Sequence, residues 1–70
     1  MKHIANAMQF EDYSINQECT IGQIFEKGRG KSKKYVVKQI WGGVTREFET
    51  YLAACQAIIT AQNTTFIRPI

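Results

Sequence analysis

The residues best suited to do chemistry in this 70-residue chain are cations gathered in one segment. Positions 27 to 46 hold five lysines, two arginines and no acid, whereas the rest of the chain holds two cations against six carboxylates. The segment therefore carries +7 and the remainder −4. Such an asymmetry attracts phosphate backbones or acidic protein surfaces. We predict a binding surface made of Lys27, Arg29, Lys31, Lys33, Lys34, Lys38 and Arg46, with Trp41 as an aromatic anchor.

Two interpretations of this surface stay open. Residues 28–34 (GRGKSKK) contain two glycines, so their cations can follow an irregular partner; the alternative is a solvated loop that keeps a small protein soluble. Trp41 either contacts a base or a protein partner or caps the end of the core. Glu47 and Glu49 weigh against direct insertion into a DNA groove, because we expect them beside Lys38 on the exposed face of a hairpin.

A phosphate-binding loop is not supported by the sequence. Gly30-Lys31-Ser32 resembles the end of such a motif, but the motif needs a glycine at position 25, where this chain has Phe25. The segment also leads into an expected strand, whereas that motif leads into a helix whose N-terminus meets the phosphates.

Metal-binding and catalytic signals are equally weak. His3, Cys19 and Cys55 are scattered, and no two of them have ligand spacing. Glu11 and Asp12 are adjacent, and neighbouring residues rarely face one site. We predict no catalytic residue, no metal site and no cofactor, and therefore a protein that is not an enzyme.

Length and composition favour one small folded domain over residues 1–70. Hydrophobic residues make up 44% and charged residues 21%, which is ordinary for a globular protein. The apolar run Tyr51–Ile59 is far short of the ~20 residues that cross a membrane. No apolar stretch follows Met1–Ile4 as in a secretory signal. We expect a cytoplasmic protein with no membrane contact and with reduced, mostly buried cysteines.

The clearest structural signal is a hairpin around Gly42-Gly43, since paired glycines suit a two-residue turn. The strands are predicted over residues 34–41 and 44–49. In the register that such a turn imposes, Trp41 faces Val44, Lys38 faces Glu47 and Val37 faces Phe48. The core face then carries Tyr35, Val37, Trp41, Val44 and Phe48.

A helix is predicted over residues 51–62, with Thr50 as its N-cap and Asn63 as its end. Its buried stripe is predicted to contain Leu52, Cys55 and Ile59, widened by Tyr51 and Ile58. The helix has no charged residue. Its outer side is either a solvated, alanine-rich face or a contact with a partner, a homodimer being one option.

The remaining segments complete the expected fold. Residues 20–26 predict a strand, residues 64–67 a short strand that Pro69 confines to an edge, and residues 1–17 are either a helix or an arm. The predicted class is α+β, a three-stranded antiparallel sheet with one C-terminal helix on a face and room for a short extra edge strand.

The order strand, Gly42-Gly43 turn, strand, Thr50 cap and helix from Leu52 resembles two groups of proteins in layout. One comprises the three-stranded DNA-binding domains at the start of phage-type integrases. The other comprises small phage-encoded inhibitors of host defence, including anti-CRISPR proteins. The resemblance covers about half of the chain and matches no family-specific motif, so it assigns no functional residue.

The second resemblance implies a phage or mobile-element inhibitor that docks through its basic hairpin on a host protein or nucleoprotein complex, such as a CRISPR effector. Docking would interfere with nucleic-acid binding by that complex. The alternative is a module that binds DNA or RNA directly through the same basic segment.

Overall fold

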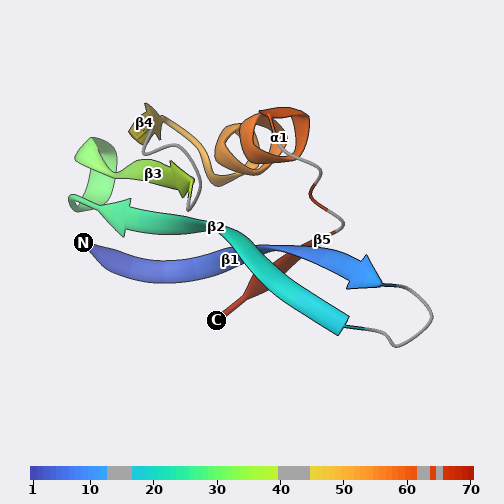
Figure 1. Ribbon diagram of the computed structural model, residues 1–70. Helices are drawn as coiled ribbons and strands as arrows, with labels where there is room; N and C mark the ends of the chain where they lie inside the picture. The colour runs from blue at the N-terminus through green and yellow to red at the C-terminus, as the bar shows by residue number, and fades with distance from the viewer. Residues whose placement is uncertain (13–16, 40–44, 62–63, 65) are drawn as a thin grey trace.

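The computed structural model describes residues 1–12, 17–39, 45–61, 64 and 66–70. Its sheet has five antiparallel strands in the order β4-β3-β2-β1-β5 (Figure 1). The elements in chain order are β1 (Lys2–Asp12), β2 (Gln17–Lys27), the single 3₁₀ turn η1 (Gly30–Ser32), β3 (Lys34–Gln39), β4 (Thr45–Phe48), α1 (Tyr51–Ala61) and β5 (Phe66–Pro69).

The α+β class is confirmed, and the predicted count of three strands is wrong. The strand expected over residues 20–26 is part of the longer β2, and the expected edge strand is β5. The additional strand is β1, which occupies most of the segment for which we predicted a helix or an arm. Irregularities between His3 and Ala5 and between Ala7 and Met8 interrupt its side-chain alternation, which hides a strand from a period-two pattern.

The long β1–β2 hairpin organises the sheet. Both strands have 11 residues, and Lys2 pairs with Glu26 at one end while Phe10 pairs with Glu18 towards the other. On its second side β1 pairs with β5, from Ala5 opposite Pro69. Since proline has no backbone N–H, the edge position of β5 accommodates Pro69 without loss of a ladder bond from a central strand.

The β3–β4 pair confirms the predicted core face among the described residues but not the predicted register. Tyr35 lies opposite Phe48, and Val37 lies opposite Arg46. Each pair is displaced by two residues from the register that a two-residue turn at Gly42-Gly43 would impose. A shift of two keeps every side chain on its predicted face. Residues 40–44, which include Trp41 and Val44, lie outside the described residues.

Helix α1 begins where the capping signal predicted. The Thr50 hydroxyl oxygen accepts a hydrogen bond from the backbone N–H of Ala53 at 3.1 Å, which satisfies a donor that the first turn leaves without a partner. The expected end, at positions 62 and 63, lies outside the described residues.

The predicted buried stripe of α1 is wrong in two positions. Leu52 is 66% exposed and Ile59 is 48% exposed. The burial of Cys55 and Ile58 is confirmed, and Ala54 is buried beside them against the sheet. Small Ala54 lets the helix approach the sheet closely, and the i, i+4 spacing of Ala54 and Ile58 places both on one face.

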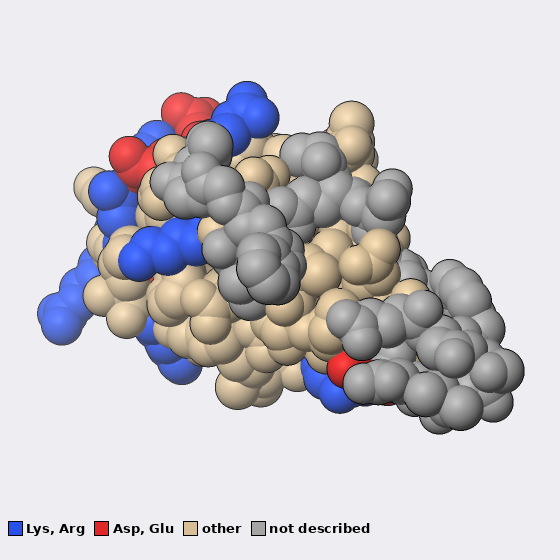
Figure 2. All heavy atoms as spheres, in the orientation of Figure 1, with Lys and Arg blue, Asp and Glu red and all other residues tan. Residues whose placement is uncertain are grey.

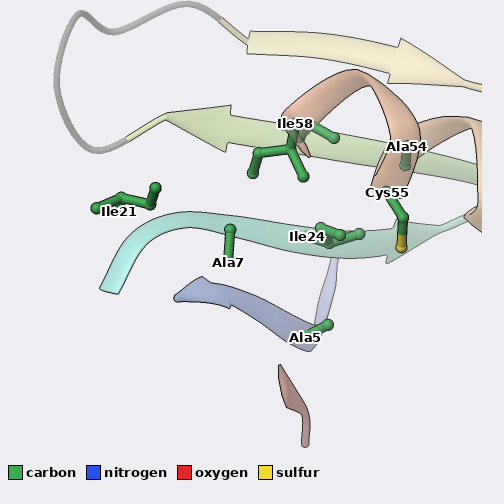
Figure 3. Packing of buried hydrophobic residues seen from close by; sticks show 8 residues of the cluster. Ala5, Ala7, Ile21, Ile24, Ala54, Cys55 and Ile58 are labelled. Atoms are coloured by element: carbon green, nitrogen blue, oxygen red, sulfur yellow. The ribbon is translucent and has the colours of Figure 1, made fainter. Parts of the chain in front are cut away.

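The core lies between α1 and one face of the sheet (Figure 3). Its largest fully buried side chains are Ile24, on β2, and Ile58, on α1. Gly22 lies under the same helix, since a Cβ atom there would stand 2.4 Å from the Ile58 Cδ1 atom. The cluster is completed by Ala5, Ala7, Ile21, Val37, Ala54 and Cys55.

Candidate functional site

Five of the predicted cations gather where β2 turns into β3, and we call Lys27, Arg29, Lys31, Lys33 and Lys34 the basic end. The connection is ordered by a 3₁₀ turn, in which the Ser32 and Lys33 amides donate to the Arg29 and Gly30 carbonyls at 3.0 and 3.2 Å. Gly28 has φ +83°, and a Cβ atom there would lie 2.6 Å from the Ser32 carbonyl oxygen. A glycine is therefore needed at this position.

Carboxylates balance part of the basic end, and Figure 2 shows them as red atoms among the blue. Pairs of this kind on a surface contribute about 0–1 kcal/mol each, so they orient the lysines more than they stabilise the fold. Three of them are described: Lys27 Nζ with Glu47 at 2.5 Å, Lys33 Nζ with Glu26 at 3.5 Å and Lys34 Nζ with Glu49 at 3.2 Å.

Arg29 and Lys31 are the unbalanced cations of the basic end. Both are exposed, and within the described part of the chain neither has a carboxylate within 4.0 Å. Glu47 and Glu49, which we expected beside Lys38, are instead paired with Lys27 and Lys34. Lysines of the basic end therefore offset the charge of these two carboxylates.

Lys38 and Arg46, the other two predicted cations, lie on opposite faces of the sheet. Lys38 is on the face away from α1, with its ammonium group 5.1 Å from the centre of the Phe25 ring. Arg46 pairs with the buried Val37, so it projects on the helix side, where its guanidinium lies 5.4 Å from the Phe48 ring centre. The predicted site is thus not one continuous surface, and Trp41 falls outside the described residues.

A depression of about 680 Å³ lies at the basic end. The strand β1 supplies Lys2, which the register places opposite Glu26. The sequence interpretation missed Lys2 because it is 25 positions from Lys27 and only the β1–β2 pairing brings the two segments together. The lining residues are Met1, Lys2, Glu26, Lys27, Gly28, Arg29, Gly30 and Lys33.

His3 and Cys55, whose side-chain types can take part in catalysis, make structural contacts instead. His3 Nε2 donates to Asn6 Oδ1 at 2.6 Å and to the Ala5 carbonyl oxygen at 3.0 Å, and the His3 ring packs 5.0 Å from that of Phe25. Cys55 is buried in the core. Among the side chains that the structure describes, which exclude Glu11 and Asp12, no three of His, Cys, Asp or Glu come together in a way that could hold a metal ion.

One titratable group in the described structure has a clearly shifted pKa. Burial raises the pKa of Tyr51 above its ordinary value of 10.0, and a hydrogen bond with Cys55 raises it further. Tyr51 packs edge-on against Tyr35 beside the core, with ring centres 5.9 Å apart. This shift belongs to the helix–sheet contact and lies away from the basic end.

No protein-family model, no curated protein and no solved structure matches the chain. Within the described residues, α1 has only 11 residues, and no helix has the length and apolar character to cross a membrane. The charge and shape of the basic end are therefore the features that bear on function.

Proposed function

We propose that this chain is a non-catalytic binding protein that docks through its basic end on a host nucleoprotein complex and interferes with nucleic-acid binding by that complex. This is the activity expected of a small phage or mobile-element inhibitor of the anti-CRISPR type. The observation that carries the proposal is the exposure of Arg29 and Lys31 on a turn that contains two glycines with positive φ. Among the described residues, no carboxylate lies within 4.0 Å of either cation.

The geometry of the turn favours recognition of a fixed anionic partner. The two hydrogen bonds across η1 and the positive φ of Gly28 hold the backbone, so little conformational entropy is lost there on binding. The neighbouring lysines are already held by Glu26, Glu47 and Glu49. An arginine on such a support can form two parallel hydrogen bonds with a carboxylate or a phosphate.

Direct binding to DNA or RNA is the second candidate function. The ion pairs of Glu47 and Glu49 weaken the objection that these acids raised against it in the sequence. Since Glu47 and Glu49 are paired with lysines, they repel a phosphate backbone less than free carboxylates would. Lys38 over the Phe25 ring adds a cation and an aromatic side chain on the face opposite α1.

Capture from host lysate, with and without nuclease, separates these functions when a charge-matched pair of variants is compared. The test variant carries Arg29→Ala and Lys31→Ala, and the control carries Arg46→Ala and Arg68→Ala. Both lower the net charge from +3 to +1. We expect the test variant to lose the captured complex and the control to retain it. Equal loss in both variants would show that net charge, and not the basic end, drives binding.

A titration of the purified chain with random duplex DNA completes the test. Binding that weakens steeply with salt, with a log–log slope near −0.9 for each phosphate contact, would favour direct nucleic-acid binding. Nuclease-resistant capture together with no salt-sensitive binding to random duplex DNA would favour the inhibitor. If guide-loaded CRISPR effectors bind target DNA equally well with and without the chain, that choice of target is wrong.

A further inference from the structure

The depression at the basic end concentrates cations from two distant parts of the sequence. Four of its lining residues are cationic: Lys2 from β1, Lys27 from the end of β2, and Arg29 and Lys33 from the β2–β3 connection. Glu26 is the one acidic lining residue described, and its carboxylate lies 3.5 Å from the Lys33 ammonium group. The lining therefore has a net charge of +3, equal to that of the whole chain.

The cations that line the depression differ in whether a carboxylate already pairs with them. Lys27 is held by Glu47, and Lys33 by Glu26. Lys2 and Arg29 are exposed and have no carboxylate within 4.0 Å in the described structure. These two side chains are free to bind an anion without first breaking an ion pair. A guanidinium suits phosphate in particular, because its planar donors match two oxygens at once.

The backbone leaves room for such an anion. Gly30 lines the depression with φ +56°, and a Cβ atom built there would meet nothing within 4 Å. Gly28 also lines it and must remain glycine for the turn to form. Two of the lining residues, Gly28 and Gly30, thus have no side chain, which permits close approach of a small, highly charged group to the backbone there.

We propose that this depression binds one phosphate group of a nucleic-acid strand, with Lys2 and Arg29 as its principal contacts. The inference rests on the proposed function, since it assumes that the partner of the basic end contains accessible nucleic acid. The phosphate comes either from the end of a strand, as a monoester with a charge of about −2, or from within the backbone, as a diester.

The experiment compares Arg29→Ala with Lys31→Ala. Both residues are exposed cations of the same turn without a described carboxylate partner, but only Arg29 lines the depression. Binding of a labelled single-stranded DNA, with and without a 5′-phosphate, is measured by fluorescence anisotropy at constant ionic strength. We expect Arg29→Ala and Lys2→Ala to weaken binding roughly tenfold, because each removes a charge-assisted hydrogen bond. Lys31→Ala should change it by less than about threefold.

The two probes identify the source of the phosphate. A requirement for the 5′-phosphate assigns the depression to a strand end, and equal binding of both probes assigns it to the backbone. Equal weakening by Arg29→Ala and Lys31→Ala would overturn the depression as a site while leaving the proposed function intact. Unchanged thermal transitions of all three variants ensure that the comparison reports on binding.

A titration with inorganic phosphate tests the depression separately from the proposed function. Amide chemical shifts of the wild-type chain are followed while phosphate replaces chloride at constant ionic strength. Shifts that saturate at Lys2 and at residues 28–30, and that disappear in Arg29→Ala, would support the depression even if the chain binds no nucleic acid. The absence of such shifts would overturn it.

Discussion

Ile58 and Ile59 are neighbours on α1 but lie in opposite environments, and this makes them a matched pair for measurement. Ile58 is fully buried in the core, whereas Ile59 is 48% exposed. We expect Ile58→Ala to lower the free energy of unfolding by about 2–5 kcal/mol, since it removes buried methyl groups and leaves a cavity. Ile59→Ala should change it by about 0.5 kcal/mol.

Urea denaturation followed by circular dichroism measures both effects. The two variants change the same side-chain type at adjacent helical positions, so differences in helix propensity cancel. Equal destabilisation by the two substitutions would contradict the orientation of α1 that the structure describes.

Tyr51 gives a second test at the residue scale, through its raised pKa. Above pH 10 the unfolded chain loses the phenolic proton more readily than the folded chain, so the unfolded state binds fewer protons and stability falls as pH rises. Replacement by Phe removes this contribution. We expect thermal unfolding midpoints of Tyr51→Phe to decline less steeply between neutral and alkaline pH than those of wild type, and parallel declines would contradict the raised pKa of Tyr51.

The orientation of α1 could not be predicted from the types and spacing of its own residues. Leu52 and Ile59 repeat at helical spacing, but so do Ala54 and Ile58, and the helix has no charged side chain to mark its solvent side. The sheet determines which face of α1 is buried, because Gly22 has no side chain and leaves space for Ile58. Helical periodicity predicted the element and its N-cap, and only the packing partner could identify its buried face.

At the scale of elements, the contact of α1 with β2 depends on the missing side chain of Gly22. A Cβ atom there would lie 2.4 Å from Ile58 Cδ1 and 3.3 Å from the Lys38 carbonyl oxygen. We expect Gly22→Ala to destabilise the fold by about 1–3 kcal/mol through overpacking. The cost should be smaller in an Ile58→Val background, because valine lacks the Cδ1 methyl group.

A double-mutant cycle by chemical denaturation measures this coupling, which for side chains in contact is about 0.5–3 kcal/mol. Gly22→Ala paired with Ile59→Val provides a control on the exposed side of the helix and should give additive effects. A cycle without coupling between positions 22 and 58 would mean that α1 does not lie over Gly22.

The elements of the candidate site were predicted unevenly. The cation-rich segment, the strand β3 and the capped helix could be predicted from local composition and spacing. The register of β3 and β4 could not, because it does not follow the short turn assumed at Gly42-Gly43. Lys2 was missed because its place at the depression depends on β1, whose interrupted alternation does not indicate a strand.

At the scale of the molecule, β5 covers one edge of the sheet and joins the two ends of the chain. It pairs with β1 from Ala5 to Met8, and Phe66 packs against Phe10 with ring centres 5.6 Å apart. Removal of residues 66–70 would expose the backbone donors and acceptors of β1. We expect the shortened chain to be less stable and to self-associate, as measured by denaturation and light scattering, because an uncovered strand edge recruits another strand.

Arg68→Ala is the control for this deletion. It removes the ion pair in which Arg68 Nη2 lies 2.7 Å from Glu18 Oε2, but it leaves the backbone hydrogen bonds between β5 and β1 in place. A surface pair contributes at most about 1 kcal/mol, so this variant should keep the association state of wild type and nearly its stability. Self-association of Arg68→Ala to the same extent would show that charge, and not coverage of the sheet edge, prevents copies of the chain from associating.

The pairing of Ala5 with Pro69 also has a kinetic consequence. Nearly the whole chain must close into a loop before this contact can form, whereas the β1–β2 hairpin needs only a short one. The last strand should therefore dock after the rate-limiting barrier has been crossed. Weakening its contacts would then accelerate unfolding and leave the refolding rate almost unchanged.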